Sequence, residues 1–468
     1  MFKTISTQNI ILIGIAVTIA FVIFIDNLII LSGIAFSVLV WLIINKESVP
    51  AVLLAFLLTL VSDINETLRL IVNALIIILL SYYFIKKYGF DLKSIPKLPQ
   101  PILTFILFII ASTFLSSLFS TNKSIGLYFL TKEVIFFFLV YLFFSFIENE
   151  NNIRYYIYAL IFPAIIVSVS VIYSFFTTDM LLFMFQTLGF ASSTAYIGNI
   201  ASVGGLLTIT IALTFYLIII NNQGKRRNVN ILYLILILQI LGLILTNSRA
   251  AYLGSFVSFA FVILSYFNDK RKLIIISSVL VIAIILVSNP KLVDAFLLLI
   301  RAERVFENPR YNLWDISFNI IKDNTLFGSG PGNFSAYMYK YNPTMLNSFA
   351  GRDVKFIHDF AAVGHSHNFF LFKFSEMGLL GLVNALLLPY FFFLYAFRIK
   401  NSIASSDNKN YWLIITIIGC GLGMFTRSIF ESTGLMSYGW ITRDLPFWIL
   451  FSIVIYLYKV KYLANENV

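Results

Sequence analysis

The stretch "ILYLILILQILGLILTNSRAAYLGSFVSFAFVILSYF", residues 231–267, holds two long apolar runs separated by only three polar residues, Thr246, Asn247 and Ser248. A helix that crosses the hydrocarbon core of a bilayer needs about 20 mostly apolar residues, with about 17 as the lower limit. The runs are continuously apolar and do not alternate with polar residues, which excludes the strands of a membrane β-barrel. The stretch therefore predicts two antiparallel membrane-spanning helices joined by a tight turn.

The same pattern recurs along the whole chain of 468 residues, of which 59% are hydrophobic and only 12% are charged. Soluble domains are nearer half apolar and a quarter charged. Hydropathy marks about fourteen spans, with approximate cores at 8–25, 28–45, 50–61, 68–85, 101–119, 125–147, 154–176, 200–220, 230–246, 249–266, 273–288, 367–396, 411–430 and 444–460. We expect an all-α, polytopic membrane protein with about 12–14 transmembrane helices and, with the single Cys420, no disulfide framework.

The net charge of +11 follows from basic loops such as "KKYGFDLKSIPK", "QGKRRN" and "NDKRK", which all fall on one side of the predicted spans. The positive-inside rule makes that side cytoplasmic and places both termini there. The basic charge is thereby explained by orientation and contact with anionic membrane lipids, and we expect no nucleic-acid partner. The opposite side carries segment 289–366, a long extracytoplasmic loop. Long ordered loops of this kind usually carry function.

The tight turn in the opening stretch contains a first candidate for anion binding. Ser248 is a natural N-cap residue, so Arg249 is predicted to open the next helix. A cation at a helix N-terminus opposes the helix dipole, but it becomes favourable when an anion binds to the free backbone N–H groups and the guanidinium together. The alternative is that Arg249 extends to lipid headgroups. The residues alone leave both interpretations open.

A second candidate lies in "ENPRYNLWDISFNIIKDNTLFGSGPGNF", residues 307–334. Pro309 marks a helix start, and Leu313, Ile316 and Ile320 give that helix an apolar stripe. Arg310 lies on the first turn, where it either meets an anion or remains a solvated charge. The glycines of "GSGPGNF" predict a turn, and they do not form a P-loop because no Gly-Lys-Ser/Thr follows.

The stretch "GHSHNFFLFKFSEMGLLG", residues 364–381, places two histidines at the start of an apolar helix. If His367 is helical, Gly378 and Gly381 share its face, so a neighbouring helix could pack closely and leave a cleft beneath the imidazole. Histidine titrates near neutrality and suits a general base. The alternative is a histidine at the membrane interface that bonds a loop carbonyl. If both histidines are helical, His365 points in nearly the opposite direction, and we do not expect the two to act as a pair.

Other ionisable residues lie within or at the ends of the predicted spans, where such groups are usually paired or functional: Lys132, Glu133, Glu376, Arg427, Glu431 and Arg443. Arg427 and Glu431 are four residues apart, which predicts a simple ion pair. Arg443 opens the last span and is a further anion candidate. The set His358, Asp359, His365 and His367 matches no standard metal-ligand spacing, so we expect no metal site.

Taken in order, Ser248-Arg249, Arg310, "GSGPGNF" and "HNFFLFKFSEMGLLG" resemble the O-antigen ligase and polymerase superfamily. The last piece fits the ligase-type signature of a histidine, a small polar residue, nine residues of any kind, a glycine, two more residues and a second glycine. In this chain these positions are His367, Asn368, Gly378 and Gly381. The resemblance covers about residues 200 to 390. It divides the chain into N-terminal transmembrane helices at 1–190, a catalytic core at 191–396 and C-terminal helices at 397–468.

This resemblance implies a glycosyltransferase of the bacterial inner membrane that uses neither a metal nor another cofactor. Its donor would be a glycan on undecaprenyl pyrophosphate, and its acceptor a sugar hydroxyl at the periplasmic face. A lipid A–core acceptor defines a ligase, whereas a second lipid-linked repeat defines a polymerase. Other polysaccharide-assembly proteins would be partners. His367 would be the base, Arg249 and Arg310 would bind the pyrophosphate, and His365, Arg443, Ser248 and Asn368 would be additional site residues.

The main alternative is a polysaccharide or lipid transporter, and a further one is a scaffold without chemistry of its own. Transporters place their polar and ionisable residues near the middle of the bilayer, often between symmetric halves. In this sequence the candidate residues gather at one predicted face, and no symmetric halves are visible. This placement favours an enzyme.

Overall fold

The computed structural model describes residues 49–59, 66–89, 91, 93–177, 200–223, 229–267, 309–341, 364–403 and 407–463. Within these ranges the regular elements are helices and no strand occurs, and ten helices are long and apolar enough to cross a membrane. The expected all-α, polytopic membrane architecture is therefore confirmed. The spans expected near 8–25, 28–45 and 273–288 lie outside the described residues.

The chain divides into two compact units, each formed by two separate stretches of sequence. The first unit comprises Met1–Ser94 and Ser145–Ser248, and the second comprises Ile95–Phe144 and Arg249–Val468. These boundaries differ from the sequential division at residues 190 and 396 that the sequence suggested. The two units are described separately below.

The first unit contains five described helices: α3 (Val49–Thr59), α4 (Glu66–Tyr88), α7 (Glu150–Thr177), α9 (Ile200–Gln223) and α10 (Val229–Thr246). α7 packs against α3, α9 and α10, and α9 also packs against α10. Small residues allow close approach, since a Cβ on Gly242 of α10 would meet the side chain of Ser168 on α7. Thr214 donates a hydrogen bond of 3.0 Å to the Gln239 side chain, which pairs two polar groups inside this helix packing.

The second unit contains the remaining helices: α5 (Gln100–Phe119), α6 (Lys123–Ser145), α11 (Arg249–Tyr266), α14 (Pro309–Asp323), α15 (Phe334–Tyr341), α17 (Phe369–Ser402), α18 (Asn408–Ser428), α19 (Ile441–Leu457) and a π-helical turn at Tyr458–Leu463. α11 packs along α18, and α17 packs against α5, α18 and α19. α19 is buried along nearly its whole length. The fit of α11 to α18 depends on Gly419, where a Cβ would crowd Val262.

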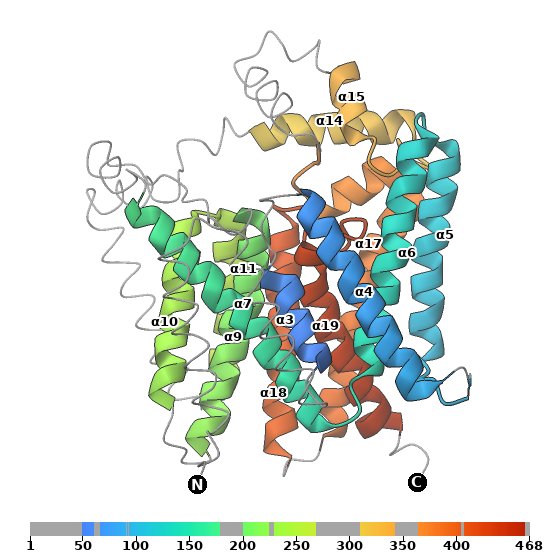
Figure 1. Ribbon diagram of the computed structural model, residues 1–468. Coiled ribbons are helices and arrows are strands. Elements are labelled where there is room, and N and C mark those ends of the chain that lie inside the picture. The colour runs from blue at the N-terminus through green and yellow to red at the C-terminus, as the bar shows by residue number, and fades with distance from the viewer. Residues whose placement is uncertain are drawn as a thin grey trace, which may run out of the picture. The chain divides into compact units, whose positions relative to one another are not determined.

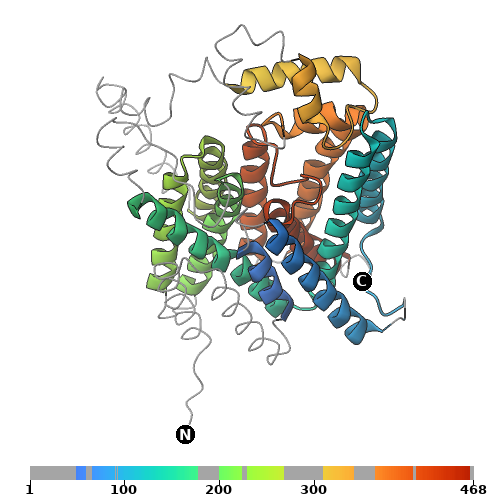
Figure 2. The same ribbon diagram turned by 45° about the horizontal axis from the view of Figure 1, so that its top comes forward.

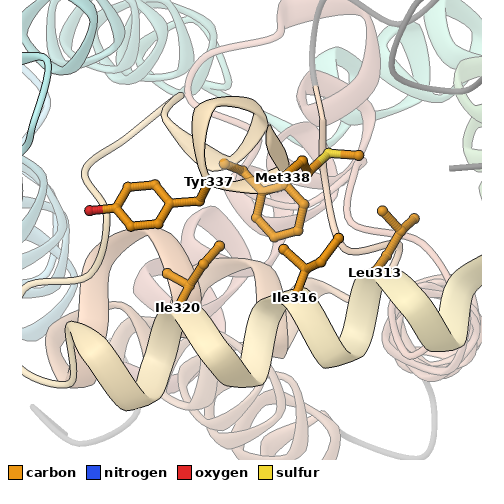
Figure 3. Packing of buried hydrophobic residues seen from close by; sticks show 6 residues of the cluster. Leu313, Ile316, Ile320, Tyr337 and Met338 are labelled. Carbon is orange, nitrogen blue, oxygen red and sulfur yellow. The ribbon is translucent and has the colours of Figure 1, made fainter. Parts of the chain in front are cut away.

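Two helices that do not span the membrane, α14 and α15, form a hairpin across one end of the second unit (Figure 1). The sequence predicted that a helix begins at Pro309, and α14 does begin there. Figure 3 shows Leu313, Ile316 and Ile320 of α14 pointing toward α15, whose Tyr337 and Met338 close this small core. The predicted apolar stripe is therefore the face that joins the two helices of the hairpin.

The turn between α14 and α15 attaches the hairpin to the spanning helices. Phe327 in the turn stacks on Phe119 at the end of α5, with ring centroids 4.1 Å apart. Asn333 donates a hydrogen bond of 2.8 Å to the hydroxyl of Ser120. The turned view of Figure 2 shows this end of the hairpin beside the ends of α5 and α6. The glycine-rich turn therefore fixes the hairpin to the unit, beyond simply reversing the chain.

Candidate active site

The two histidines lie in a short non-helical segment immediately before α17. Asn368 is the N-cap, and its side chain accepts a hydrogen bond of 3.0 Å from the backbone N–H of Leu371. His367 adopts a φ of 50°, in the left-handed region that non-glycine residues seldom occupy. This backbone turns the rings of His365 and His367 toward each other, with centroids 4.1 Å apart. The prediction that the histidines point in opposite directions is wrong, because it extended helical periodicity past the N-cap.

The glycines of the signature serve a different purpose from the one predicted. Gly378 has a φ of 62° and interrupts the helical geometry of α17. A Cβ there would collide with the backbone of Leu326, which lies in the hairpin turn. A Cβ on Gly381 would meet the carbonyl of Lys373 on the other side of this kink. The glycines thus bend α17 and admit the hairpin turn, and the predicted cleft of packed helices beneath His367 is not what they form.

Glu431, in the loop that follows α18, is the acidic partner of the histidines. One carboxylate oxygen, Oε1, accepts hydrogen bonds from the backbone of Ser432 at 3.0 Å and the hydroxyl of Thr433 at 3.3 Å. The other, Oε2, lies 3.5 Å from Nδ1 of His367, an ion-pair distance that is longer than a typical hydrogen bond. Sequence spacing had paired Glu431 with Arg427. Arg427 interacts electrostatically with Glu431, but it donates its hydrogen bond of 2.6 Å to the carbonyl of Thr433.

The electrostatics assign different charge states to these groups. Burial lowers the pKa of His365 to about 3, and the nearby His367 and Arg443 add to that effect. Burial alone would raise the pKa of Glu431, but His367, His365 and Arg427 outweigh it and hold the pKa well below its usual value. At neutral pH, therefore, His365 is an uncharged imidazole and Glu431 is a carboxylate.

One of the predicted arginines acts on this carboxylate, and a second acts on that arginine. Arg310, in the first turn of α14, interacts electrostatically with Glu431 and with Arg249, the first residue of α11. Burial lowers the pKa of Arg310. The positive charge of Arg249 lowers it further, while the negative charge of Glu431 raises it. The guanidinium stays charged because arginine titrates far above neutrality. Ser248 directly precedes Arg249, and its backbone N–H lies 3.4 Å from the Thr246 hydroxyl that accepts it.

Two more arginines come from the C-terminal helices. Arg427 is buried in the last turn of α18. Arg443, near the start of α19, lies 3.4 Å from the ring centroid of Trp440 and acts electrostatically on His365. The described part of this cluster therefore contains four guanidinium groups, from Arg249, Arg310, Arg427 and Arg443, against the carboxylate of Glu431 and that of Asp444, which acts on Arg427. Such an excess of forked cationic donors suits an anion with several oxygens, such as a phosphate or pyrophosphate.

The same cluster also has the outline of a metal site. One ligand atom from each of His365, His367 and Glu431 lies within 4.8 Å of the others. Two imidazoles and a carboxylate are a known zinc ligand set, but the surrounding guanidinium groups repel a divalent cation. His358 and Asp359, the other two residues considered as ligands, lie outside the described residues. The charge around the cluster fits an anion better than a metal ion.

The geometry of His367 suits proton transfer. If Nδ1 carries the proton that faces Glu431, Nε2 holds the free electron pair. A carboxylate on the other ring nitrogen fixes the tautomer and orients the imidazole ring. The His367 side chain is 29% exposed, so a substrate can reach it, while Glu431 is only 9% exposed. The site therefore combines an oriented base with a concentration of positive charge.

Comparison with known protein families agrees with these residues. The family model described as O-antigen ligase matches residues 232–386, a segment that contains Arg249, Arg310 and both histidines. Glu431 and Arg443 lie beyond the match. A search of curated proteins finds no match to the chain. Residues 232–386 are therefore similar to the O-antigen ligase family, which supports the resemblance to the O-antigen ligase and polymerase superfamily.

Proposed function

We propose that the protein transfers a glycan from undecaprenyl pyrophosphate to a sugar hydroxyl, at the periplasmic face of the bacterial inner membrane. The observation that carries this proposal is the contact between Glu431 and His367, placed among arginines at the end of the unit where the hairpin lies. A hydroxyl nucleophile needs a base, and a pyrophosphate leaving group needs cations. A lipid pyrophosphate is also held at headgroup depth, where residues at the ends of spanning helices can reach it.

In the proposed reaction Nε2 of His367 accepts the proton of the acceptor hydroxyl. The acceptor oxygen then forms a bond to the anomeric carbon of the donor, and the bond from that carbon to the pyrophosphate oxygen breaks. The electron pair leaves with undecaprenyl pyrophosphate, whose charge Arg249 and Arg310 stabilise. A single displacement of this kind inverts the anomeric configuration. Metal ions have no part in this scheme. In the proposed topology, both termini lie in the cytoplasm.

The acceptor that we favour is lipid A–core, because the signature formed by His367, Asn368, Gly378 and Gly381 is of the ligase type. The direct test is to incubate the purified protein with lipid-linked repeats, with and without lipid A–core. A shift of the core band to higher mass supports a ligase. A ladder of longer lipid-linked chains, formed without the core, assigns the protein as a polymerase, and the absence of any transfer refutes the proposal.

The base can be tested by substitution in the same assay. His367→Ala is expected to bind donor normally and to lose transfer by roughly a hundredfold or more, because the proton has no acceptor. Glu431→Gln keeps the hydrogen-bond acceptor but removes the charge that orients His367, so transfer should fall by roughly tenfold or more. Asp407→Asn, at the N-cap of α18, is the matched control and should behave like wild type. Near-normal transfer by His367→Ala, or loss of activity with a chelator, would refute the base assignment.

A further inference from the structure

A buried lysine lies within the second unit, six residues after His367. Lys373 of α17 is fully buried, and its ammonium lies 3.6 Å from the ring centroid of Tyr438. A charge inside a membrane protein is costly unless opposite charges compensate it. Lys373 interacts electrostatically with three carboxylates that are themselves buried, those of Glu133, Glu376 and Asp444. Helices α6, α17 and α19 thus contribute to one internal charge cluster, which the proposed reaction does not use.

The carboxylate of Glu376 holds the hairpin. Oε1 of Glu376 accepts a hydrogen bond of 3.1 Å from the backbone N–H of Phe334, the first residue of α15. The backbone carbonyl of Glu376 accepts two more, from the N–H of Gly330 at 2.8 Å and from the hydroxyl of Ser116 at 3.0 Å. The hairpin that bears Arg310 is therefore bonded to α17 at the position of Glu376.

The second carboxylate holds the loop that carries Glu431. Asp444 of α19 accepts a hydrogen bond of 3.0 Å from the backbone N–H of Gly434 and one of 2.8 Å from the hydroxyl of Ser437. Tyr438, in the same loop, has a φ of 53°, and its buried ring packs against the ammonium of Lys373. The loop is thus held by both Asp444 and Lys373.

The remaining carboxylate, that of Glu133, is not bonded to the hairpin or to the loop. Oε2 of Glu133 accepts a hydrogen bond of 2.5 Å from Thr113 on α5, and Oε1 is buried without a hydrogen-bond partner among the described residues. Among the described residues, the hydrogen bond of the Glu133 side chain is with Thr113 of α5, and not with the hairpin turn or the loop. Glu133 therefore offers a way to change the charge of the cluster without cutting the bonds made by Glu376 and Asp444.

We propose that Lys373 is a positioning residue: its ammonium compensates Glu376 and Asp444, and so holds the hairpin with Arg310 and the loop with Glu431 in place around His367. This inference rests on the proposed function for its effect on transfer. Its structural part, the fixing of the hairpin and of the loop, is independent of any activity. With Lys373 removed, Glu133 and Glu376 lose the cation that compensates them, and Asp444 keeps only its electrostatic interaction with Arg427, so the segments that Glu376 and Asp444 hold should loosen.

The test compares Lys373→Met, the double variant Lys373→Met/Glu133→Gln, and the control Lys400→Met on the last turn of the same helix. Hydrogen exchange of the backbone in peptides covering 326–338 and 430–440 reports on the two segments directly. We expect at least tenfold faster exchange in Lys373→Met, with transfer reduced by at least tenfold, and recovery of much of both losses in the double variant. Lys400→Met should match wild type.

Unchanged exchange in Lys373→Met would overturn the proposal. A double variant no better than the single one would also overturn it, because Lys373 would then merely fill space. If Lys373→Met fails to accumulate in the membrane while the double variant accumulates, charge compensation is supported. A pattern of exchange that follows the expectation, in a wild-type protein that transfers no glycan, would instead refute the proposed function and leave the positioning role intact.

Discussion

At the scale of single residues, the cluster around His367 gathers side chains from separate parts of the chain. Arg249, Arg310 and His367 were singled out from their positions at helix starts and from a family signature, and the structure brings them into one cluster. Their relation to His365 was misjudged because helical periodicity was applied to residues before the N-cap. Asn368, a strong N-cap residue, was the available signal that the helix begins only at Phe369.

Glu431 was missed as the partner of His367 for a different reason. It lies 64 positions further along the chain, and a contact at that distance follows from tertiary packing. The only local rule that applied to Glu431 was pairing at a spacing of four residues, which pointed to Arg427. That spacing holds on a helix, but α18 ends at Ser428 and Glu431 lies in the loop beyond it.

The buried His365 should make the stability of the protein depend on pH. Its pKa is about 3 in the folded state against an ordinary value of 6.5, so between these values the unfolded chain binds more protons than the folded one. Its contribution is therefore complete above pH 6.5 and is lost progressively toward pH 3. From pH 7 to pH 5 the free energy of unfolding should fall by about 2 kcal/mol from this group.

Thermal unfolding in detergent, for wild type and His365→Asn between pH 7 and pH 5, measures this effect. Glu431 does not interfere, because its lowered pKa confines its contribution to stability to pH values around and below 4.5. The variant should show a flatter dependence on pH than wild type. Parallel curves for the two proteins would show that His365 can be protonated in the folded state.

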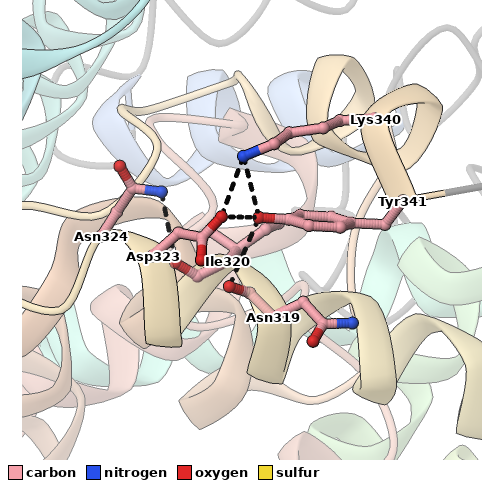
Figure 4. Close-up of polar contacts among 6 residues, drawn as sticks. All are labelled: Asn319, Ile320, Asp323, Asn324, Lys340 and Tyr341. Carbon is pink, nitrogen blue, oxygen red and sulfur yellow. Dashed lines mark hydrogen bonds and ion pairs between the residues drawn. The ribbon is translucent and has the colours of Figure 1, made fainter.

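At the scale of elements, the α14–α15 hairpin shows what a local pattern can and cannot predict. Pro309 and the apolar stripe predicted α14, because helix starts and 3.6-residue periodicity are local properties. The core that the stripe forms with α15 is tertiary. Figure 4 shows a second link between the helices, in which Asp323 accepts from Lys340 at 2.9 Å and from the hydroxyl of Tyr341. This group is exposed, so solvent screens it and it contributes little to stability.

The hairpin should therefore depend on its apolar core and not on its surface ion pair. Ile316 is fully buried, and Ile316→Ala should destabilise the hairpin by about 2–5 kcal/mol through lost burial and the resulting cavity. Hydrogen exchange in α14 and α15 should accelerate, and the donor KM should rise because Arg310 lies on α14. Asp323→Asn serves as the control and should change neither quantity. A larger effect from Asp323→Asn than from Ile316→Ala would reverse this assignment.

At the scale of the whole molecule, hydropathy predicted the spans well. Within the described residues, every predicted span from 68–85 onward coincides with a candidate transmembrane helix, while the short one at 50–61 corresponds to the short helix α3. The bilayer itself explains this success, because backbone groups in lipid must bond within their own helix. The interleaved composition of the two units and the buried charges around Lys373 were beyond prediction, since both depend on which helices pack together.

The orientation of the protein across the membrane follows from the same reasoning and can be measured. α17 is a candidate span, the hairpin packs near its N-terminal half, and Asn408 follows its C-terminal end after the basic residues Arg398 and Lys400. The positive-inside rule predicts that the side of Asn408 is cytoplasmic. A cysteine at the exposed Asn319 of α14 should react with an impermeant maleimide in intact spheroplasts, whereas one at the exposed Asn408 should react only after permeabilisation. The native Cys420 is buried and should add little background. The reverse labelling pattern would place the arginines and His367 in the cytoplasm, where a periplasmic glycan donor cannot reach them, and the proposed function would fail with the topology.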